Sequence, residues 1–198
     1  MKYKNIVFDF GNVLAKFDAD YIIGMFCQDE NDAAVIKEKL FFDWDKLDAG
    51  YYEYDKYMDH VADMLPKYLI PVFREISTQW YMHLDPIKDI WKLIHDLKET
   101  GKYKLYILSN ASTIFSDHAS YYSITKEFDG IVFSAPLKMA KPEPDIYKYL
   151  FKTYDLDPEE CFFIDDRKDN IEAGNALGMD GLVFTPDKID ELRKLLLQ

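Results

Sequence analysis

The chain has 198 residues, 48% hydrophobic and 30% charged, which is enough for one ordered domain with a modest insertion. Its formal net charge of −12 argues against nucleic acid and anionic membrane surfaces as partners, because both require basic patches. Two cysteines far apart in the chain, Cys27 and Cys161, and the lack of any run near the ~20 apolar residues of a membrane span favour a reduced cytoplasmic protein.

The first predicted element is a buried strand that ends at a carboxylate. Residues 6–8 are apolar, Asp9 follows them, and the chain then turns through Gly11 and Asn12. A short apolar run bounded by a turn is typical of a strand in a parallel sheet. Ligands bind at the carboxyl ends of such strands, so Asp9 is expected where chemistry is done. A lone aspartate in this place also fits a helix cap or a turn.

Residues 17–83 are predicted to form a small helical domain. Apolar residues recur at helical spacing over 53–65 and again at Phe73, Ile76 and Trp80, and shorter helices are expected over 19–27 and 33–41. The block follows the turn after the first strand directly, so we expect it to cover the strand ends as a lid. A lid can exclude water and select the leaving group.

The lid contains both structural aromatics and candidates for substrate contact. Most of its aromatic side chains are expected to form its own core. Asp43, Trp44 and Asp45 follow a predicted helix and precede a turn at Ala49-Gly50. Asp43 and Trp44 are therefore candidate substrate-binding residues, with Asp45 beside them.

The remainder of the chain alternates between strands and helices. Asp85 and Pro86 are predicted to cap and begin a helix that Gly101 ends. Strands are expected over 104–108, 131–133, 161–164 and 182–184, and helices over 112–121, from Pro144, over 168–177 and at the C-terminal end. This pattern predicts an α/β fold, a doubly wound parallel sheet with helices on both faces. The core domain would comprise residues 1–16 and 84–198, and the α-helical cap domain residues 17–83.

Polar residues follow three of the later strands. Ser109 and Asn110 come after one, Lys141 after the next, and Asp165 with Asp166 after a third. Each has an ordinary explanation as a cap, a solvated loop residue or a surface pair. Together with Asp9 they form, in this order, a set suited to metal-assisted phosphoryl transfer.

Four short segments carry a family resemblance: Asp9-Phe10-Gly11-Asn12-Val13, Ser109-Asn110, Lys141-Pro142 and Asp165-Asp166-Arg167-Lys168-Asp169-Asn170. Over residues 6–180 the chain resembles the haloacid dehalogenase-like (HAD) hydrolases. It is most similar to their helical-cap phosphatases, the group with the sugar-1-phosphate phosphatases and the N-terminal phosphatase domain of soluble epoxide hydrolase. The resemblance implies a Rossmann-like core and a phosphoric monoester hydrolase acting on a small phosphorylated metabolite, for example a sugar phosphate.

A metal site is part of this expectation, because a phosphomonoester dianion repels an attacking carboxylate. Mg²⁺ takes oxygen ligands and is often held by one or two carboxylates plus the phosphate. Asp9 and Asp166 are the expected side-chain ligands. The resemblance implies the backbone carbonyl of Gly11 as a third ligand, with Asp165 and Asn170 holding these ligands in place.

The resemblance also implies the roles of the remaining residues. Asp9 would attack phosphorus and form an aspartyl-phosphate, which water hydrolyses. Lys141 would offset negative charge, and Ser109 would donate a hydrogen bond to the phosphoryl oxygens. The residues expected at the substrate are Asn12, Ser109, Asn110, Lys141, Asp43 and Trp44.

One departure from the family pattern concerns proton transfer. Most phosphatases of this superfamily carry a second aspartate two residues after the nucleophile, whereas this chain has Gly11 there. General acid–base help contributes ~10²–10⁴-fold, so its loss favours slow turnover or good leaving groups. The sugar-1-phosphate phosphatases also have glycine at this position.

Two alternatives to the phosphatase remain open. A catalytically weak or degenerate scaffold with a binding or regulatory role would follow from Gly11. A haloacid dehalogenase would use Asp9 to attack carbon, but such enzymes need no cation and therefore no acidic pair like Asp165 and Asp166. A phospho-receiver domain also uses aspartate, serine and lysine, yet lacks a helical insertion after its first strand.

Overall fold

A computed structural model describes residues 2–197 and contains a five-stranded parallel sheet in the order β5-β4-β1-β6-β7. Strand β1 lies at its centre, and Phe8 pairs with Ile107 on β4 and with Ile164 on β6. The residues that follow these three strands therefore meet at one edge. The strand bounds are β1 Asn5–Phe8, β4 Lys104–Ser109, β5 Gly130–Phe133, β6 Cys161–Asp165 and β7 Asp180–Val183.

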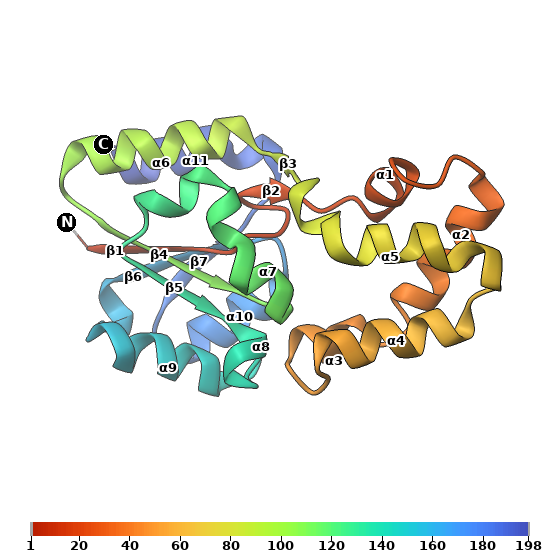
Figure 1. Cartoon of the computed structure of the whole chain (residues 1–198). Helices are drawn as coiled ribbons and strands as arrows, with labels where there is room; N and C mark the ends of the chain where they lie inside the picture. Colours follow the sequence, from red (N-terminus) through yellow and green to blue (C-terminus); the bar gives the residue numbers. More distant parts are fainter. Residues whose placement is uncertain (1, 198) are drawn as a thin grey trace.

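Helices cover both faces of the sheet, which confirms the predicted doubly wound α/β architecture (Figure 1). Helices α6 (Lys88–Thr100) and α11 (Ile189–Leu197) lie on one face, and α9 (Pro144–Tyr154) and α10 (Lys168–Ala176) lie on the other. Successive residues of β1 point to opposite faces: Ile6 and Phe8 join one buried cluster, and Val7 joins the second. Both faces are apolar because both are covered.

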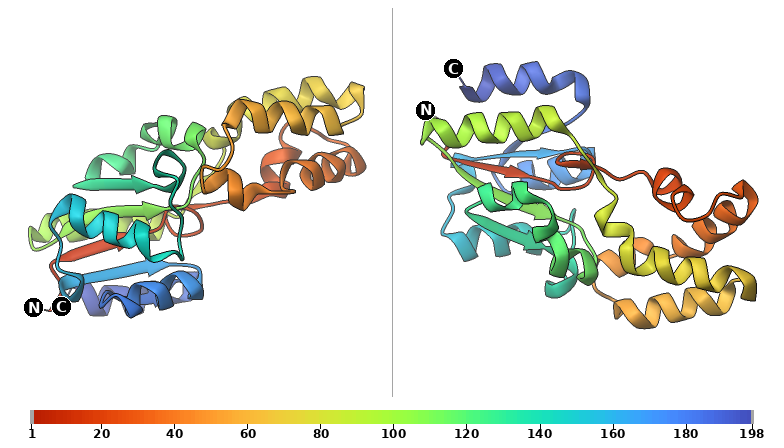
Figure 2. Two further views of the ribbon diagram at one scale, coloured as in Figure 1. Left: turned by 90° about the horizontal axis from the view of Figure 1, so that it is seen from below. Right: turned by 45° about the horizontal axis from the view of Figure 1, so that its top comes forward.

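A block of five α-helices extends beyond the carboxyl ends of the strands (Figure 1), and the two further views show the same separation (Figure 2). This block occupies the position expected of the lid. The division into domains at 16/17 and 83/84 stays a prediction. The helix bounds are α1 Ala19–Gly24, α2 Glu30–Leu40, α3 Trp44–Asp48, α4 Tyr54–Met64 and α5 Ile70–Gln79.

Aromatic side chains join the helical block to the sheet. The ring of Phe10, which follows β1, lies 4.7 Å from that of Phe115 on helix α7 (Thr113–His118), and Phe115 lies 5.9 Å from Trp80. Trp80 in turn contacts Trp44 at 5.5 Å between ring centroids. Each such pair adds about 0.5–1.5 kcal/mol beyond its buried area. The buried apolar cluster is thereby continuous from the core into the lid.

The predicted helix start at Asp85 and Pro86 is wrong. These two residues form strand β3 (Asp85–Pro86), which pairs antiparallel with β2 (Ala15–Lys16), and α6 begins at Lys88. Proline lacks an N–H, which a short two-stranded ribbon tolerates because its edge needs no partner. The pairing brings together the two segments that connect the core with the helical block.

Smaller differences concern short elements and boundaries. Helices α3 and α8 (Ser134–Leu137) were not predicted, because five or fewer residues show no helical periodicity. Strand β7 begins two residues earlier than expected, and the helix predicted over 112–121 is α7 followed by a 3₁₀ turn, Ala119–Tyr121. In the lid, Tyr54 and Trp80 are buried as expected, but Tyr51 is 68% exposed.

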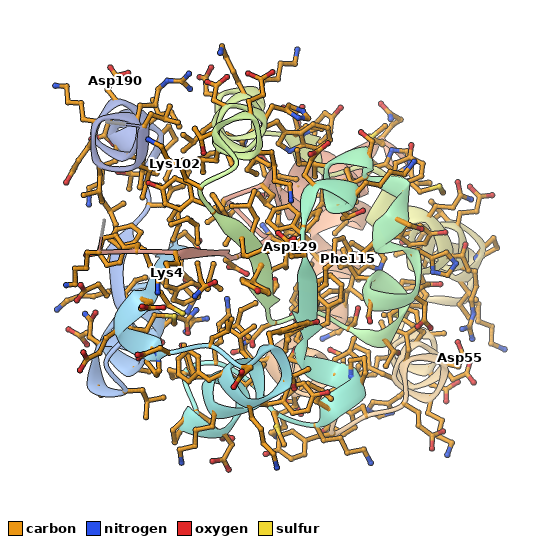
Figure 3. All side chains as sticks on the ribbon, turned by 90° about the vertical axis from the view of Figure 1, so that its left-hand side faces the viewer. Lys4, Asp55, Lys102, Phe115, Asp129 and Asp190 are labelled. Atoms are coloured by element: carbon orange, nitrogen blue, oxygen red, sulfur yellow. The ribbon has the colours of Figure 1, made fainter. Side chains whose placement is uncertain are left out.

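The amino ends of the strands lie opposite the helical block. Figure 3 views the molecule from this side and labels Lys4, Lys102 and Asp129 there. The Asp129 carboxylate accepts hydrogen bonds from Leu105 N at 2.9 Å and from the Nζ atoms of Lys98 and Lys104, both at 3.1 Å. These contacts organise the edge that faces away from the predicted chemistry.

Two further features bear on the sequence-based expectations. Cys27 and Cys161 are both free thiols with little exposure, and burial raises the pKa of Cys161 to about 12, which keeps it protonated and unreactive.

Among the described residues, helices reach neither the length nor the apolar character that crossing a bilayer would require.

The contact between the lid and the core predicts an effect of Gly50→Ala. Gly50 has φ +76°, and an added Cβ would lie 2.3 Å from the carbonyl oxygen of Ala135 on α8. Gly101 is the matched control, because its φ is +63° but a Cβ there would meet nothing within 4 Å. Both alanines carry a left-handed cost of about 1–2 kcal/mol. Gly50→Ala should cost about 1–3 kcal/mol more from overpacking, measured by urea unfolding. Equal losses in the two variants would contradict this close approach.

Candidate active site

Asp9 stands at the carboxyl end of the central strand. Its backbone N–H donates to Ile164 O at 2.9 Å, which continues the sheet pairing, and its Oδ1 accepts from Phe10 N at 2.7 Å. The chain then turns at Asn12, which has φ 55°, and the Asn12 side-chain oxygen accepts from Phe17 N at 3.1 Å. Asparagine tolerates this left-handed conformation well. The turn fixes the Asp9 carboxylate at the edge of the sheet that faces the lid.

A buried lysine connects two of the predicted carboxylates. Lys141 Nζ lies 2.9 Å from Asp9 Oδ1 and 2.6 Å from Asp165 Oδ2, and it donates to Leu108 O at 2.9 Å. Burial opposes the charge on Lys141, but Asp9 and Asp165 outweigh it and raise the pKa of the lysine. Lys141 therefore remains a cation beside Asp9.

Ser109 and Asn110 hold the surroundings of this ion pair. Asn110 Nδ2 donates to Lys141 O, and Lys141 N donates to Asn110 Oδ1, both at 2.8 Å, so the two segments are locked together. The Ser109 hydroxyl is buried and accepts from Phe10 N at 3.4 Å. The sequence motifs after β1 and β4 and the Lys141 loop thus meet as predicted.

The acidic pair divides into an inward and an outward carboxylate. Asp165 is fully buried and accepts from Asn170 Nδ2 at 3.0 Å on both oxygens and from Arg167 N at 2.8 Å. Asp166 is only partly buried and accepts from Asn12 Nδ2 at 3.1 Å, and burial raises the pKa of its carboxyl. Asp165 is saturated with donors, whereas Asp166 faces open space.

The ionisation of Asp9 is finely balanced. Burial raises the pKa of Asp9 to about 6, with Asp165 adding to the rise, while Lys141 and a hydrogen bond from Ser109 oppose it. Because this pKa lies below 7, most of the Asp9 carboxyl is ionised at neutral pH. A bound cation next to Asp9, in addition to Lys141, would stabilise the ionised carboxylate further.

Three of the carboxylates could hold a metal ion. Ligand oxygens of Asp9, Asp165 and Asp166 all lie within 4.8 Å of one another. Carboxylate oxygens suit Mg²⁺, and Asn170 Oδ1 is buried with no hydrogen-bond partner among residues 2–197, as a group that accepts from a metal-bound water would be. The residues present thus fit this ion. Gly11 lines the same cavity, and the role of its carbonyl as a ligand stays a prediction.

A cavity of about 470 Å³ opens in front of these groups. The lid supplies one wall, and the predicted Asp43 and Trp44 lie in it. The lid also contributes residues that the sequence did not indicate as candidates, above all Asp48. This residue lies on the short helix α3, whose five residues show no periodicity from which its inner face could be predicted. The cavity is lined by Asp9, Gly11, Asn12, Phe17, Phe41, Phe42, Asp43, Trp44, Asp45, Asp48, Asn110, Lys141, Asp166, Arg167 and Asn170.

Several predicted residues reach the cavity with their polar groups already engaged. The Asp43 carboxylate accepts from Tyr52 OH and pairs with Lys46 at 3.1 Å, and these contacts lower its pKa. The amides of Asn12 and Asn110 bond within the protein. Ser109 is buried and is not among the residues that line the cavity. Their roles at the substrate stay predictions.

The chain resembles known hydrolases over most of its length. A family model described as haloacid dehalogenase-like hydrolase matches residues 3–178. The chain is 27% identical to a D-ribitol-5-phosphate phosphatase of Bacteroides thetaiotaomicron, over 98% of this chain and 96% of that protein. It is also 27% identical to a sesquiterpene phosphatase of Aspergillus oryzae, over 98% and 97%.

The chain also resembles a solved structure with ligands. A HAD family enzyme from Bacteroides thetaiotaomicron, in complex with magnesium and inorganic phosphate, is 26% identical and superposes with a TM-score of 0.70. The match covers 92% of this chain and 94% of that one.

The carboxylate cluster predicts a metal-dependent gain in stability. At 100 times its dissociation constant, Mg²⁺ should add about 2.7 kcal/mol to the free energy of unfolding. Asp166→Asn should largely remove this gain, since it replaces an outward carboxylate of the cluster. Asp169→Asn is the control, because Asp169 lies nearby but pairs with Arg167 at 2.9 Å. Thermal unfolding with and without Mg²⁺ measures the effect, and an unchanged gain in Asp166→Asn would refute the assignment.

Proposed function

Because this chain belongs to the haloacid dehalogenase-like hydrolases, we propose that it is a Mg²⁺-dependent phosphatase that acts on a small phosphorylated metabolite through an aspartyl-phosphate on Asp9. The observation that carries the proposal is the contact of Lys141 Nζ with Asp9 Oδ1 at 2.9 Å, at the floor of a cavity lined by a carboxylate cluster. A nucleophilic carboxylate that must approach an anionic phosphate needs such neighbouring positive charge.

Each residue of the site has its own role in the proposed phosphoryl transfer. Asp9 attacks phosphorus in line with the leaving oxygen, and water later hydrolyses the aspartyl-phosphate. Lys141 offsets charge on the phosphoryl oxygens, and the Ser109 hydroxyl with nearby backbone N–H groups donates hydrogen bonds to them. Asp9, Asp166 and the Gly11 carbonyl would hold Mg²⁺, which would add positive charge against the phosphoryl oxygens. Asp165 and Asn170 keep these groups in position.

Known relatives support the reaction type and the metal. One relative is named a D-ribitol-5-phosphate phosphatase and another a sesquiterpene phosphatase, and a related enzyme was crystallised with magnesium and inorganic phosphate. The two phosphatases differ widely in leaving group. We therefore argue the substrate class from the cavity of this chain.

The lid side of the cavity favours a leaving group without negative charge. Its polar side chains there include the carboxyls of Asp43 and Asp45, and its apolar surface comes from Phe17, Phe41, Phe42 and Trp44. Arg167, a basic side chain at the rim, is held by Asp169 through Nε at 3.2 Å and Nη2 at 2.9 Å. Acidic groups accept hydrogen bonds from hydroxyls and repel anions. A polyol or sugar monophosphate fits this surface.

The alternatives make different demands on the site. A degenerate scaffold would bind Mg²⁺ and phosphate without multiple turnover, and Gly11 is the feature that favours it. A dehalogenase would have no use for the outward carboxylate of Asp166 beside Asp9 and Asp165. The carboxylate cluster therefore supports the phosphatase over the dehalogenase. A cytoplasmic location stays a prediction.

Asp9→Asn tests the nucleophile. Hydrolysis of p-nitrophenyl phosphate and a panel of sugar phosphates should depend on Mg²⁺ in the parent and fall to background in Asp9→Asn, because an amide cannot form the acyl phosphate. Asp145→Asn is the control, since Asp145 lies exposed on α9 and its side chain is 69% accessible. A parent that binds Mg²⁺ and phosphate but turns over no substrate would instead establish the degenerate scaffold.

The acidic lid predicts discrimination between matched substrates. Glucose 6-phosphate and 6-phosphogluconate share a carbon skeleton, and the second adds a carboxylate at the end remote from the phosphate. We expect kcat/KM to be at least about tenfold lower for 6-phosphogluconate, equivalent to about 1.4 kcal/mol of repulsion. Steady-state kinetics at two salt concentrations measures the ratio, which should shrink as salt screens the lid. A preference for the anionic substrate would contradict the proposed class.

A further inference from the structure

The first observation is a gap in the proton chemistry next to the nucleophile. Gly11 lies two residues after Asp9 and lines the cavity but carries no side chain that could give a proton to a leaving group. A Cβ at Gly11 would meet nothing within 4 Å, so sterics do not demand glycine there. Alkoxide leaving groups are poor, and their expulsion benefits from a general acid. Any such acid must come from elsewhere around the cavity.

Three carboxyls of the lid line the cavity, and only one is suited to that task. Asp43 is engaged by Tyr52 and Lys46, which lower its pKa and keep it charged. Asp45 is exposed to water. Asp48, at the end of α3, is partly buried and receives hydrogen bonds from the Trp44 side chain and from Ser112 N.

Contacts with the core hold Asp48 in place. The Ser134 hydroxyl donates to Asp48 O and accepts from Ala111 N at 2.8 Å, so one buried serine joins the lid to the segment after β4. Helix α3 packs against α8 here, as Figure 1 shows. The backbone of Asp48 is thus tied to the same segment that presents Ser109, and its position relative to Asp9 is set by the core.

We propose that Asp48 is the general acid and base of the reaction, a role that rests on the proposed phosphatase function and replaces the aspartate missing at Gly11. In the first step, Asp9 Oδ forms a bond to phosphorus while the bond to the leaving oxygen breaks, and that oxygen takes the proton of Asp48. The alcohol departs and Asp48 is left as a carboxylate.

The second step restores both residues. Asp48 takes a proton from a water molecule as the water oxygen bonds to phosphorus. The bond between phosphorus and Asp9 Oδ then breaks, which releases inorganic phosphate and returns Asp9 to a carboxylate. Asp48 ends protonated, as it began, so the cycle balances without a further reactant.

The electrostatic surroundings fit this cycle. Burial raises the pKa of Asp48 to about 8, Asp45 and Asp9 add to the rise, and the hydrogen bonds from Trp44 and Ser112 N oppose it. A carboxyl with this pKa is protonated at neutral pH and can also act as a base. The other charged groups around the same cavity are Asp43, Lys141, Asp166 and Arg167.

Asp48→Asn with substrates of different leaving group tests the role. Asparagine keeps the acceptor for Ser112 N but has no proton to transfer. We expect kcat/KM to fall ~10²–10⁴-fold for glucose 6-phosphate and by less than about fivefold for p-nitrophenyl phosphate, whose leaving group needs no acid. With the latter substrate, a burst of p-nitrophenolate should appear, because hydrolysis of the aspartyl-phosphate loses its base. Asp63→Asn, an exposed carboxyl on lid helix α4 that does not line the cavity, should change neither value.

Other outcomes have distinct meanings. Equal losses on both substrates, matched by Ser134→Ala, would show that Asp48 only docks the lid and would overturn the inference while the phosphatase stands. Unchanged kinetics in Asp48→Asn would overturn it as well. A parent without Mg²⁺-dependent turnover on either substrate would refute the proposed function itself, and the inference with it.

A second measurement does not depend on activity. A carboxyl whose pKa is raised on folding binds its proton more tightly in the folded state, so its contribution is complete below the unfolded pKa near 4 and is lost as pH rises through about 8. Between pH 5 and pH 9, the parent should therefore lose thermal stability relative to Asp48→Asn by a few degrees in Tm. A difference in Tm that does not change with pH would show that Asp48 is charged at neutral pH and would overturn the inference.

Discussion

The buried ammonium of Lys141 is the constraint around which the core is arranged. A cation without access to water is costly unless its partners are in contact, and here Asp9, Asp165 and the Leu108 carbonyl all lie within 2.9 Å of Nζ. These partners come from the ends of β1, β6 and β4, which are neighbours in the sheet. The strand order that satisfies the lysine also assembles the charges required for phosphoryl transfer.

The two aspartates after β6 show how the sheet separates support from chemistry. Asp165 is surrounded by Lys141, Asn170 and the Arg167 N–H, so its oxygens are fully used inside the protein. Asp166, one residue later, follows the end of β6, is less buried and lines the cavity. One buried carboxylate can thus fix the geometry while its neighbour stays available to a ligand.

The lid and the core meet through apolar and polar contacts with different consequences. The aromatic contacts among Phe10, Phe115 and Trp80 are part of the apolar cluster that continues from the core into the lid. The hydrogen bond from the Ser134 hydroxyl to Asp48 O sets the orientation of the lid, because it fixes one turn of α3 relative to the segment after β4. Apolar contact therefore holds the lid against the core, and a few polar contacts determine which lid residues face the cavity.

The sequence by itself determined the alternating elements, the strand ends at Asp9, Ser109 and Asp165, and the expectation of a helical lid. These features are local: an apolar run and the polar residue after it lie together in the chain. Only the tertiary structure decided that Asp85 and Pro86 pair with Ala15 and Lys16 instead of starting a helix, and that Asp48 faces the cavity. Both depend on segments far apart in sequence, and a five-residue helix has no periodicity from which its inner face could be predicted.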